Sequence, residues 1–178
     1  IIVRGLGRGL SLADWLSWVP LTTALAAAEA VQETAAISLA LKWPNDLLLG
    51  ERKVGGILCE SSLTLPADPV VVIGIGLNVN VPGELFPDEL RPIATSLFES
   101  SHQLIDRNRL LAQLLLELEQ SLDELRDHGP SRLLQAYMRR CTTLGRQVRV
   151  VLGANEELLG TAVAITADGT LQVRPSTG

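Results

Sequence analysis

A strand-like run with glycine at alternate positions is the feature that most constrains the fold. Residues 69–80 read PVVVIGIGLNVN, and their many β-branched residues predict a β-strand. Side chains alternate between the two faces of a strand, so Gly74 and Gly76 face the same side of the predicted sheet. Missing side chains on one face let a flat ligand lie against the backbone, or allow close packing of the preceding helix. Taken alone, the run leaves both interpretations open.

A predicted hairpin just before this run carries glycines of its own. Residues 46–49 (DLLL) and 54–63 (VGGILCESSL) read as strands joined by a turn at 50–52. Gly55 and Gly56 stand where a strand usually carries bulk. Glycines in two neighbouring strands favour the interpretation that a ligand lies against the sheet over the interpretation that a helix packs closely there.

Helical patterns surround these strands. The Ala- and Leu-rich segment 20–34 predicts a buried helix with Pro20 at its first helical position. A second helix is predicted over 106–129, capped by Asp106 and stopped by Gly129 and Pro130, and a shorter one over 131–141. We expect the second helix to pack a leucine stripe against the sheet. The stripe consists of Leu110, Leu111, Leu114, Leu115, Leu118, Leu122 and Leu125.

The pattern changes after Cys141. Short alternating strands, with a turn at Asp168 and Gly169, predict a small antiparallel unit of the β-barrel type. The sequence therefore predicts an α+β chain with two domains. Residues 1–141 would form a mixed or antiparallel sheet flanked by helices, and residues 142–178 a small β-barrel.

Composition and charge argue against several classes of protein. With 178 residues, 47% of them hydrophobic, the chain can bury a sizeable core. A net charge of −5 without a run of Lys or Arg argues against nucleic-acid binding. The longest apolar runs fall short of the ~20 residues that a membrane helix needs, so we expect no association with a membrane.

The cysteines and the first residues bear on location. Cys59 and Cys141 lie far apart and outside any metal-binding motif, so they read as reduced thiols in the cytoplasm. The first residues lack the regions of a signal peptide. Because the chain opens without Met, inside a strand-like segment, we expect it to be a fragment.

A polar set lies among the apolar and glycine residues of the hairpin. Lys is rarely buried unless paired, so Lys42 and Lys53 in a strand-rich setting need anionic partners. Asp46 can pair with one of them, and a phosphate or carboxylate ligand can serve the other. A purely structural Lys–Asp ion pair is the alternative interpretation. Asn45 and Asp46 after Pro44 also fit an ordinary turn.

Three blocks in this region carry a resemblance to a known family. KWPND at 42–46, RKVGGILCE at 52–60 and VIGIGLNVN at 72–80 closely resemble, in order and spacing, the signature blocks of biotin protein ligases. The Ala-rich helix, ATSL at 94–97 and LGRQVRVV at 144–151 are also similar to that family. The resemblance implies a class II synthetase-like catalytic domain followed by an SH3-like C-terminal domain.

The resemblance implies an ATP-dependent reaction in two steps. Such enzymes use ATP and Mg²⁺ to form biotinyl-5′-AMP, and no covalent enzyme intermediate is needed. They then transfer biotin to a lysine of the biotin carboxyl carrier protein of acetyl-CoA carboxylase. The carboxylate of biotin attacks the α-phosphate, where a fixed lysine and Mg²⁺ offset the charge.

The resemblance also assigns roles to positions of this sequence. Lys53 would reach the junction of the biotin carboxylate and the α-phosphate, and Lys42 would face the nucleotide. Asp46 is a candidate Mg²⁺ ligand and a candidate to orient or deprotonate the acceptor amine. Asn78 would help to hold the adenylate. Glycines and one isoleucine would line the biotin pocket or expose backbone to it: Gly55, Gly56, Ile57, Gly74 and Gly76.

One family feature has no counterpart here, and three rival functions follow. The Gly-Arg-rich loop expected well before the Ala-rich helix is not matched, and residues 4–15 (RGLGRGLSLADW) are expected to be a loop after a strand. The rivals are a lipoate protein ligase, a non-catalytic remnant that binds biotin or a carrier, and a structural dimerisation domain in which the 69–80 strand pairs across an interface. A homodimer is also compatible with the ligase.

Overall fold

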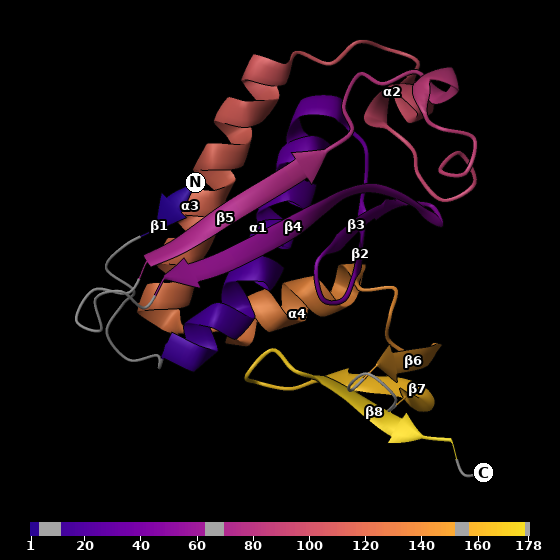
Figure 1. Cartoon of the computed structure of the whole chain (residues 1–178). Helices are drawn as coiled ribbons and strands as arrows, with labels where there is room; N and C mark the ends of the chain where they lie inside the picture. Colours follow the sequence, from indigo (N-terminus) through magenta and orange to yellow (C-terminus); the bar gives the residue numbers. More distant parts are fainter. Residues whose placement is uncertain (4–11, 63–69, 152–156, 177–178) are drawn as a thin grey trace.

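Two antiparallel sheets organise the molecule (Figure 1). The computed structural model describes residues 1–3, 12–62, 70–151 and 157–176, so most of the predicted loop at 4–15 lies outside the described residues. The first sheet has the order β1-β5-β4-β3-β2. Its strands are β1 (Ile2–Val3), β2 (Ala40–Lys42), β3 (Asp46–Leu49), β4 (Arg52–Ser62) and β5 (Val70–Leu77). An antiparallel sheet flanked by helices confirms the predicted α+β class.

The first helix is longer than predicted. Helix α1 (Leu12–Ala35) begins well before Pro20, which lies inside it rather than at its start. Pro20 has no backbone N–H, so the carbonyl of Leu16 loses its helical hydrogen bond. The preceding turns nevertheless bury Trp15 and Trp18, which are 3% and 0% exposed, and this apolar burial offsets the lost bond. Proline alone therefore misplaced the helix start.

Helix α3 (Arg107–His128) follows the sequence closely at its ends. The Asp106 carboxylate accepts hydrogen bonds from the backbone N–H groups of Asn108 and Arg109, and Gly129 ends the helix with φ of 75°. The predicted leucine stripe is too wide, because Leu111 and Leu115 are 51% and 45% exposed. The helix packs chiefly against α1 rather than against the sheet. Four leucines of α3 are therefore buried, and the remaining leucines of the stripe are left partly or largely exposed. The buried leucines are Leu110, Leu114, Leu118 and Leu125.

The remaining elements connect the first sheet to the second. A short 3-10 helix η1 (Gly83–Leu85) and helix α2 (Leu97–Ser101) follow β5, and helix α4 (Ser131–Arg140) contacts α1 and β2. The second sheet has the order β6-β7-β8, formed by β6 (Gln147–Val151), β7 (Glu157–Ile165) and β8 (Leu171–Pro175). Among the described residues, no helix has the length and apolar character needed to cross a membrane.

The two faces of the first sheet have different surroundings. Figure 1 views the sheet from the side opposite α1, so that β4 and β5 lie in front of the helices. On the helix side, Ile57, Val71 and Ile73 are at most 2% exposed and join the core. We call this side the covered face and the other side the open face.

Candidate functional site

A row of four residues crosses the open face from strand to strand. Lys42 pairs with Asp46, Asp46 with Gly56, and Gly56 with Gly76, in four adjacent strands of the antiparallel sheet. Directly opposed residues in such strands project to the same face. The register thus brings a lysine, a carboxylate and two bare backbone positions into one line.

Asp46 holds two lysines at one end of this row. One of its carboxylate oxygens forms an ion pair with the Lys53 ammonium, and the other lies 3.8 Å from the Lys42 ammonium. The lysine side chains are 51% and 58% exposed, whereas that of Asp46 is 20% exposed. Two cations against one anion leave one positive charge unneutralised. The lysines are thus exposed, and their surplus charge can attract a further anion.

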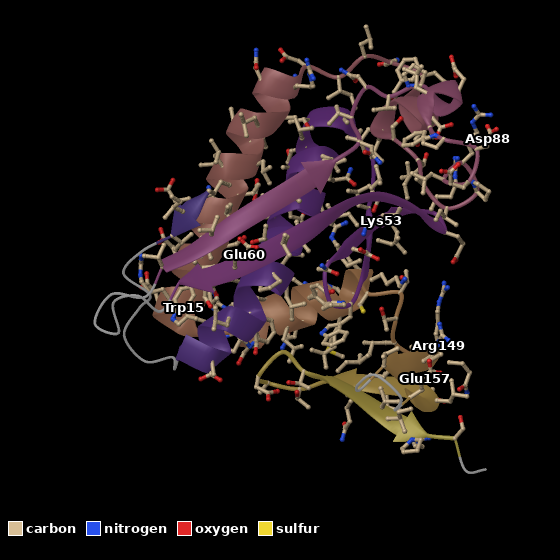
Figure 2. The ribbon with its side chains drawn as sticks, viewed as in Figure 1. Trp15, Lys53, Glu60, Asp88, Arg149 and Glu157 are labelled. Carbon is tan, nitrogen blue, oxygen red and sulfur yellow. The ribbon has the colours of Figure 1, made fainter. Side chains whose placement is uncertain are left out.

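Gly56 makes room for the Lys53 side chain. A Cβ atom at Gly56 would lie 3.2 Å from both Cε and Nζ of Lys53, closer than ordinary van der Waals contact. The absence of a side chain there therefore lets the ammonium lie over the row. Figure 2 shows Lys53 at the β3 end of β4, with Glu60 toward the other end of the same strand.

Gly74 and Gly76 lie on the open face, as the alternation of the strand predicts. A Cβ at Gly74 would come no closer than 3.4 Å to the Leu58 carbonyl oxygen, and one at Gly76 no closer than 3.8 Å to that of Gly56. Neither glycine is required by close packing against the described residues. Packing of a described helix therefore does not explain these glycines. Together with the exposed side chains of Leu58 and Val72, they form an apolar surface with accessible backbone.

Gly55 and Ile57 lie toward the covered face. Ile57 is 2% exposed in the core. Gly55 pairs with Leu47 and Leu77, and a Cβ on it would lie 2.5 Å from the Gly76 carbonyl oxygen. Packing within the sheet explains this glycine. Of the residues assigned to the biotin pocket, Gly56, Gly74 and Gly76 lie together on the open face. Gly55 and Ile57 lie on the covered face instead.

Asn78 anchors a neighbouring segment. Its side-chain amide donates to the Thr95 carbonyl at 3.0 Å, and its backbone carbonyl accepts from Leu97 N–H at 2.9 Å. The same segment grips Lys53, which donates its N–H to the Ile93 carbonyl at 2.7 Å and accepts from Thr95 N–H at 2.9 Å. Asn78 therefore supports the backbone beside Lys53.

Asn45 holds the loop before Asp46 in position, a role that the sequence pattern did not indicate because it also fits an ordinary turn. Its carbonyl accepts from Ile57 N–H at 2.9 Å, and its side-chain amide donates to the Ile57 carbonyl at 2.7 Å. These two bonds tie the loop before Asp46 to strand β4. The signal available was its place between Pro44 and the acidic residue, but its partner is distant in sequence.

The second sheet and its turns dock onto this loop. Trp43 donates its backbone N–H to the Thr143 hydroxyl at 2.9 Å and its indole N–H to the Gly169 carbonyl at 3.1 Å. Trp18 donates its indole N–H to the Ala167 carbonyl at 2.9 Å. These bonds fit the expectation that Trp43 shapes the loop, and they place the C-terminal residues beside the polar set.

A cavity of about 570 Å³ opens between the two sheets at this point. Its volume lies within the range of about 300–1,000 Å³ typical of small-molecule sites. Charged and polar side chains from both sheets line it, among them Lys42, Asp46, Glu51, Lys53, Thr143 and Arg146. Lys42, Lys53 and Arg146 outnumber the carboxylates of Asp46 and Glu51 in this lining, which suits an anionic ligand.

A second cavity, of about 450 Å³, lies among β1, α1 and α3. Its walls are largely apolar and include Trp15 and Leu118. None of Lys42, Asp46 and Lys53 lines it. The chemistry of the polar set therefore belongs to the first cavity.

Burial disfavours ionisation of one thiol and one phenol of this domain. Burial raises the pKa of the Cys59 thiol to about 11, so it stays protonated near neutral pH. Burial also raises the pKa of Tyr137, with smaller contributions from Cys141 and Asp46. Within the described ranges, no cluster of three His, Cys, Asp or Glu side chains is placed to hold a metal.

Comparison with known proteins identifies similar chains. Residues 11–80 match the biotin/lipoate A/B protein ligase family, and residues 143–178 match the biotin protein ligase C-terminal domain. The biotin–acetyl-CoA-carboxylase ligase of Mycobacterium tuberculosis is 38% identical over 86% of this chain and 55% of its own length. The bifunctional ligase/repressor BirA of Bacillus subtilis is 33% identical over 89% of this chain and 48% of its own length.

The fold has a solved counterpart as well. The biotin protein ligase of Aquifex aeolicus, in complex with biotin and ATP, superposes with a TM-score of 0.80 at 26% identity. The match covers 97% of this chain and 68% of that chain. The chain spans about half the length of the curated relatives it matches.

Proposed function

We propose that this chain, which belongs to the biotin/lipoate A/B protein ligase family and carries the C-terminal domain of biotin protein ligases, is the part of such a ligase that joins biotin to AMP and transfers it to a protein lysine. The row from Lys42 through Asp46 and Gly56 to Gly76 carries the proposal. It sets a bare apolar floor next to a cationic end. A ligand with a flat apolar ring system and a carboxylate fits that order.

Biotin would lie across the open face. Its ring system would contact the backbone at Gly56, Gly74 and Gly76, beside the exposed Leu58. Gly55 and Ile57 would contribute through the strand that carries Gly56, since their side of β4 faces the core. The carboxylate of biotin would then point toward Lys53.

Lys53 would stabilise the approach of two anions. A carboxylate oxygen of biotin attacks the α-phosphorus of ATP, and the bond from that phosphorus to the bridging oxygen of pyrophosphate breaks. Negative charge builds up where carboxylate and phosphate meet, and a fixed ammonium group lowers the barrier there. Asp46 holds that ammonium in place through their ion pair.

The nucleotide would occupy the cavity between the sheets. Lys42 lines this cavity and would face the phosphates, while Asn78 would hold the adenylate through the segment at 93–97. Mg²⁺ usually binds through one or two carboxylates together with substrate phosphates and waters. Asp46 in the cavity wall fits that donor set, and the bound ion would neutralise phosphate charge.

The second step transfers biotin to an acceptor. The amine of an acceptor lysine attacks the carbonyl carbon of biotinyl-5′-AMP, AMP leaves, and the amine loses a proton. This amine is mostly protonated near neutral pH, so a nearby carboxylate is needed. Asp46 is the candidate to orient or deprotonate it.

The proposed acceptor is the biotin carboxyl carrier protein of acetyl-CoA carboxylase. The printed name of the Mycobacterium tuberculosis relative, which includes that carboxylase, supports this choice. Both cysteines are free thiols, in keeping with a reaction in the cytoplasm. A homodimer stays a prediction for measurement in solution.

Pyrophosphate release tests the proposal. The protein that contains this sequence is mixed with ATP and Mg²⁺, and biotin or lipoate is added. Release that requires biotin is expected. Release with lipoate alone would move the assignment to a lipoate ligase. Binding of biotin with no release in either case would favour the non-catalytic remnant.

A further inference from the structure

Arg146 is a charged residue of the C-terminal segment that faces the proposed nucleotide cavity. It lies directly before β6 and lines the cavity together with Lys42 and Lys53. Its guanidinium donates two hydrogen bonds to the Glu51 carboxylate, at 3.0 and 2.9 Å. Glu51 sits in the turn between β3 and β4 and lines the same cavity. The pair therefore joins the two sheets at the cavity wall.

Stability does not account for this pair. The side chains of Arg146 and Glu51 are 54% and 76% exposed, and exposed ion pairs contribute little to folding. The indole hydrogen bonds of Trp18 in α1 and Trp43 in the loop between β2 and β3 already hold the turn before β8 in place. Arg146 lowers the pKa of Glu51 through their hydrogen bonds and charge, so Glu51 is ionised near neutral pH.

The charges around the cavity leave a place for a phosphate. Asp46 is shared between the two lysines, and Glu51 is the partner of Arg146. A guanidinium binds a phosphate with the same two-pronged geometry that it uses for a carboxylate. An exchange of Glu51 for a phosphate would cost little, because the existing pair is open to solvent.

We propose that Arg146 binds the phosphate groups of the nucleotide and exchanges Glu51 for them, so that the C-terminal domain supplies a binding residue to the active site. The inference rests on the proposed ligase function. It adds a cation from the segment directly before β6 to the two lysines of the first sheet. Glu51 then acts as a competitor that holds Arg146 in place until the nucleotide binds.

The chain offers a matched control. Arg149 and Glu157 form another exposed Arg–Glu pair in the small sheet, with a separation of 3.5 Å and side chains 66% and 50% exposed. Neither residue lines the cavity. Figure 2 shows this pair on the small sheet. Arg149→Ala therefore removes the same chemical group without touching the proposed site.

The test measures KM for ATP in biotin-dependent pyrophosphate release, with the protein that contains this sequence and saturating biotin. We expect Arg146→Ala to raise KM for ATP by about 10- to 100-fold, as for loss of a charged hydrogen bond, and to leave the Kd for biotin unchanged. Arg146→Lys should have a smaller effect of the same sign, since an ammonium lacks the fork. Arg149→Ala should match the wild type.

Glu51→Gln distinguishes two roles of Arg146: binding of phosphate, or only an ion pair that links the two sheets. If Arg146 binds phosphate, removal of its competitor leaves KM for ATP unchanged or lowers it. A mere latch between the sheets predicts the same loss for Glu51→Gln as for Arg146→Ala, and that result would overturn the inference. If the wild type is active and Arg146→Ala has an unchanged KM for ATP, the inference about Arg146 is wrong while the proposed ligase function stands. A wild type that releases no pyrophosphate would instead overturn the proposed function beneath it.

Discussion

The two faces of β4 and β5 are built from alternate residues of the same strands, yet they are chemically opposite. The covered face presents Ile57, Val71 and Ile73, each at most 2% exposed. The open face presents Gly56, Gly74 and Gly76, and none of the described helices lies over it in Figure 1. Bulk on one side makes the core, and its absence on the other side leaves backbone for a ligand.

Gly55 sharpens the comparison, because it is a glycine with the opposite explanation. A side chain there would collide with the Gly76 carbonyl oxygen, whereas one at Gly76 would meet nothing closer than 3.8 Å. Packing within the sheet thus requires Gly55, whereas packing against the described residues does not require Gly76. Neighbouring glycines in one motif therefore serve two different purposes.

The sharpest way to break the comparison is to fill the open face. Gly76→Val should weaken biotin binding by at least about 100-fold, or ~3 kcal/mol, because the new side chain occupies the ligand's floor. The thermal midpoint should stay close to that of the wild type, since the space is open and valine favours a strand. Calorimetric titration of biotin measures the loss.

Gly76→Ala is the graded companion of that variant. It should give a smaller loss of affinity with the same stability. Normal biotin affinity in Gly76→Val would show that the ligand does not lie on this face.

The cationic end of the open face is the next target. Lys53→Ala should lower the rate of pyrophosphate release by about 10²–10³-fold, because it removes the charge that offsets two approaching anions. Single-turnover kinetics measure the rate. Lys42→Ala is the comparison, because Lys42 pairs with the same Asp46 carboxylate. We expect it to raise KM for ATP more than it lowers the rate of pyrophosphate release. A Lys53→Ala enzyme with normal turnover would remove Lys53 from the chemistry.

A conservative change on the covered face should affect stability instead. Ile73→Val deletes one buried methylene and should cost about 0.5–1.5 kcal/mol in the free energy of unfolding. Urea denaturation measures this cost. Biotin affinity should match the wild type, and a selective loss of affinity without destabilisation would contradict the division between the faces.

An effect of similar size is expected at the link to the second sheet. Trp43→Phe removes the indole donor to the Gly169 carbonyl and should cost about 1 kcal/mol in unfolding free energy. Thermal denaturation followed by circular dichroism measures it. Trp15→Phe is a useful comparison, since the indole N–H of Trp15 has no hydrogen-bond partner among the described residues. An equal loss in both variants would show that ring volume, not the hydrogen bond, matters.

Local rules predicted those parts that local chemistry determines. Asp106 and Gly129 bound α3 as their capping preferences indicate, and strand alternation placed Gly74 and Gly76 on one face. Proline preference failed at Pro20, where burial of the tryptophans outweighs one lost hydrogen bond. Helical periodicity also overstated the core, because it cannot tell how wide a face its partner covers.

Contacts between distant residues were beyond the sequence. Asn45 and Ile57 meet only because the hairpin folds back, and Arg146 meets Glu51 only because the second sheet docks beside Trp43. The family blocks pointed to Lys53 and Asp46. Only the register showed that Gly56 leaves room for the lysine and that Gly55 serves the core.

The most direct measurement is a crystal structure of the protein that contains this sequence, grown with biotin, ATP and Mg²⁺. We predict ligand density across Gly56, Gly74 and Gly76, with the Lys53 ammonium at the junction of the acyl group and the phosphate. Density in the apolar cavity among β1, α1 and α3, with the open face bare, would contradict the account.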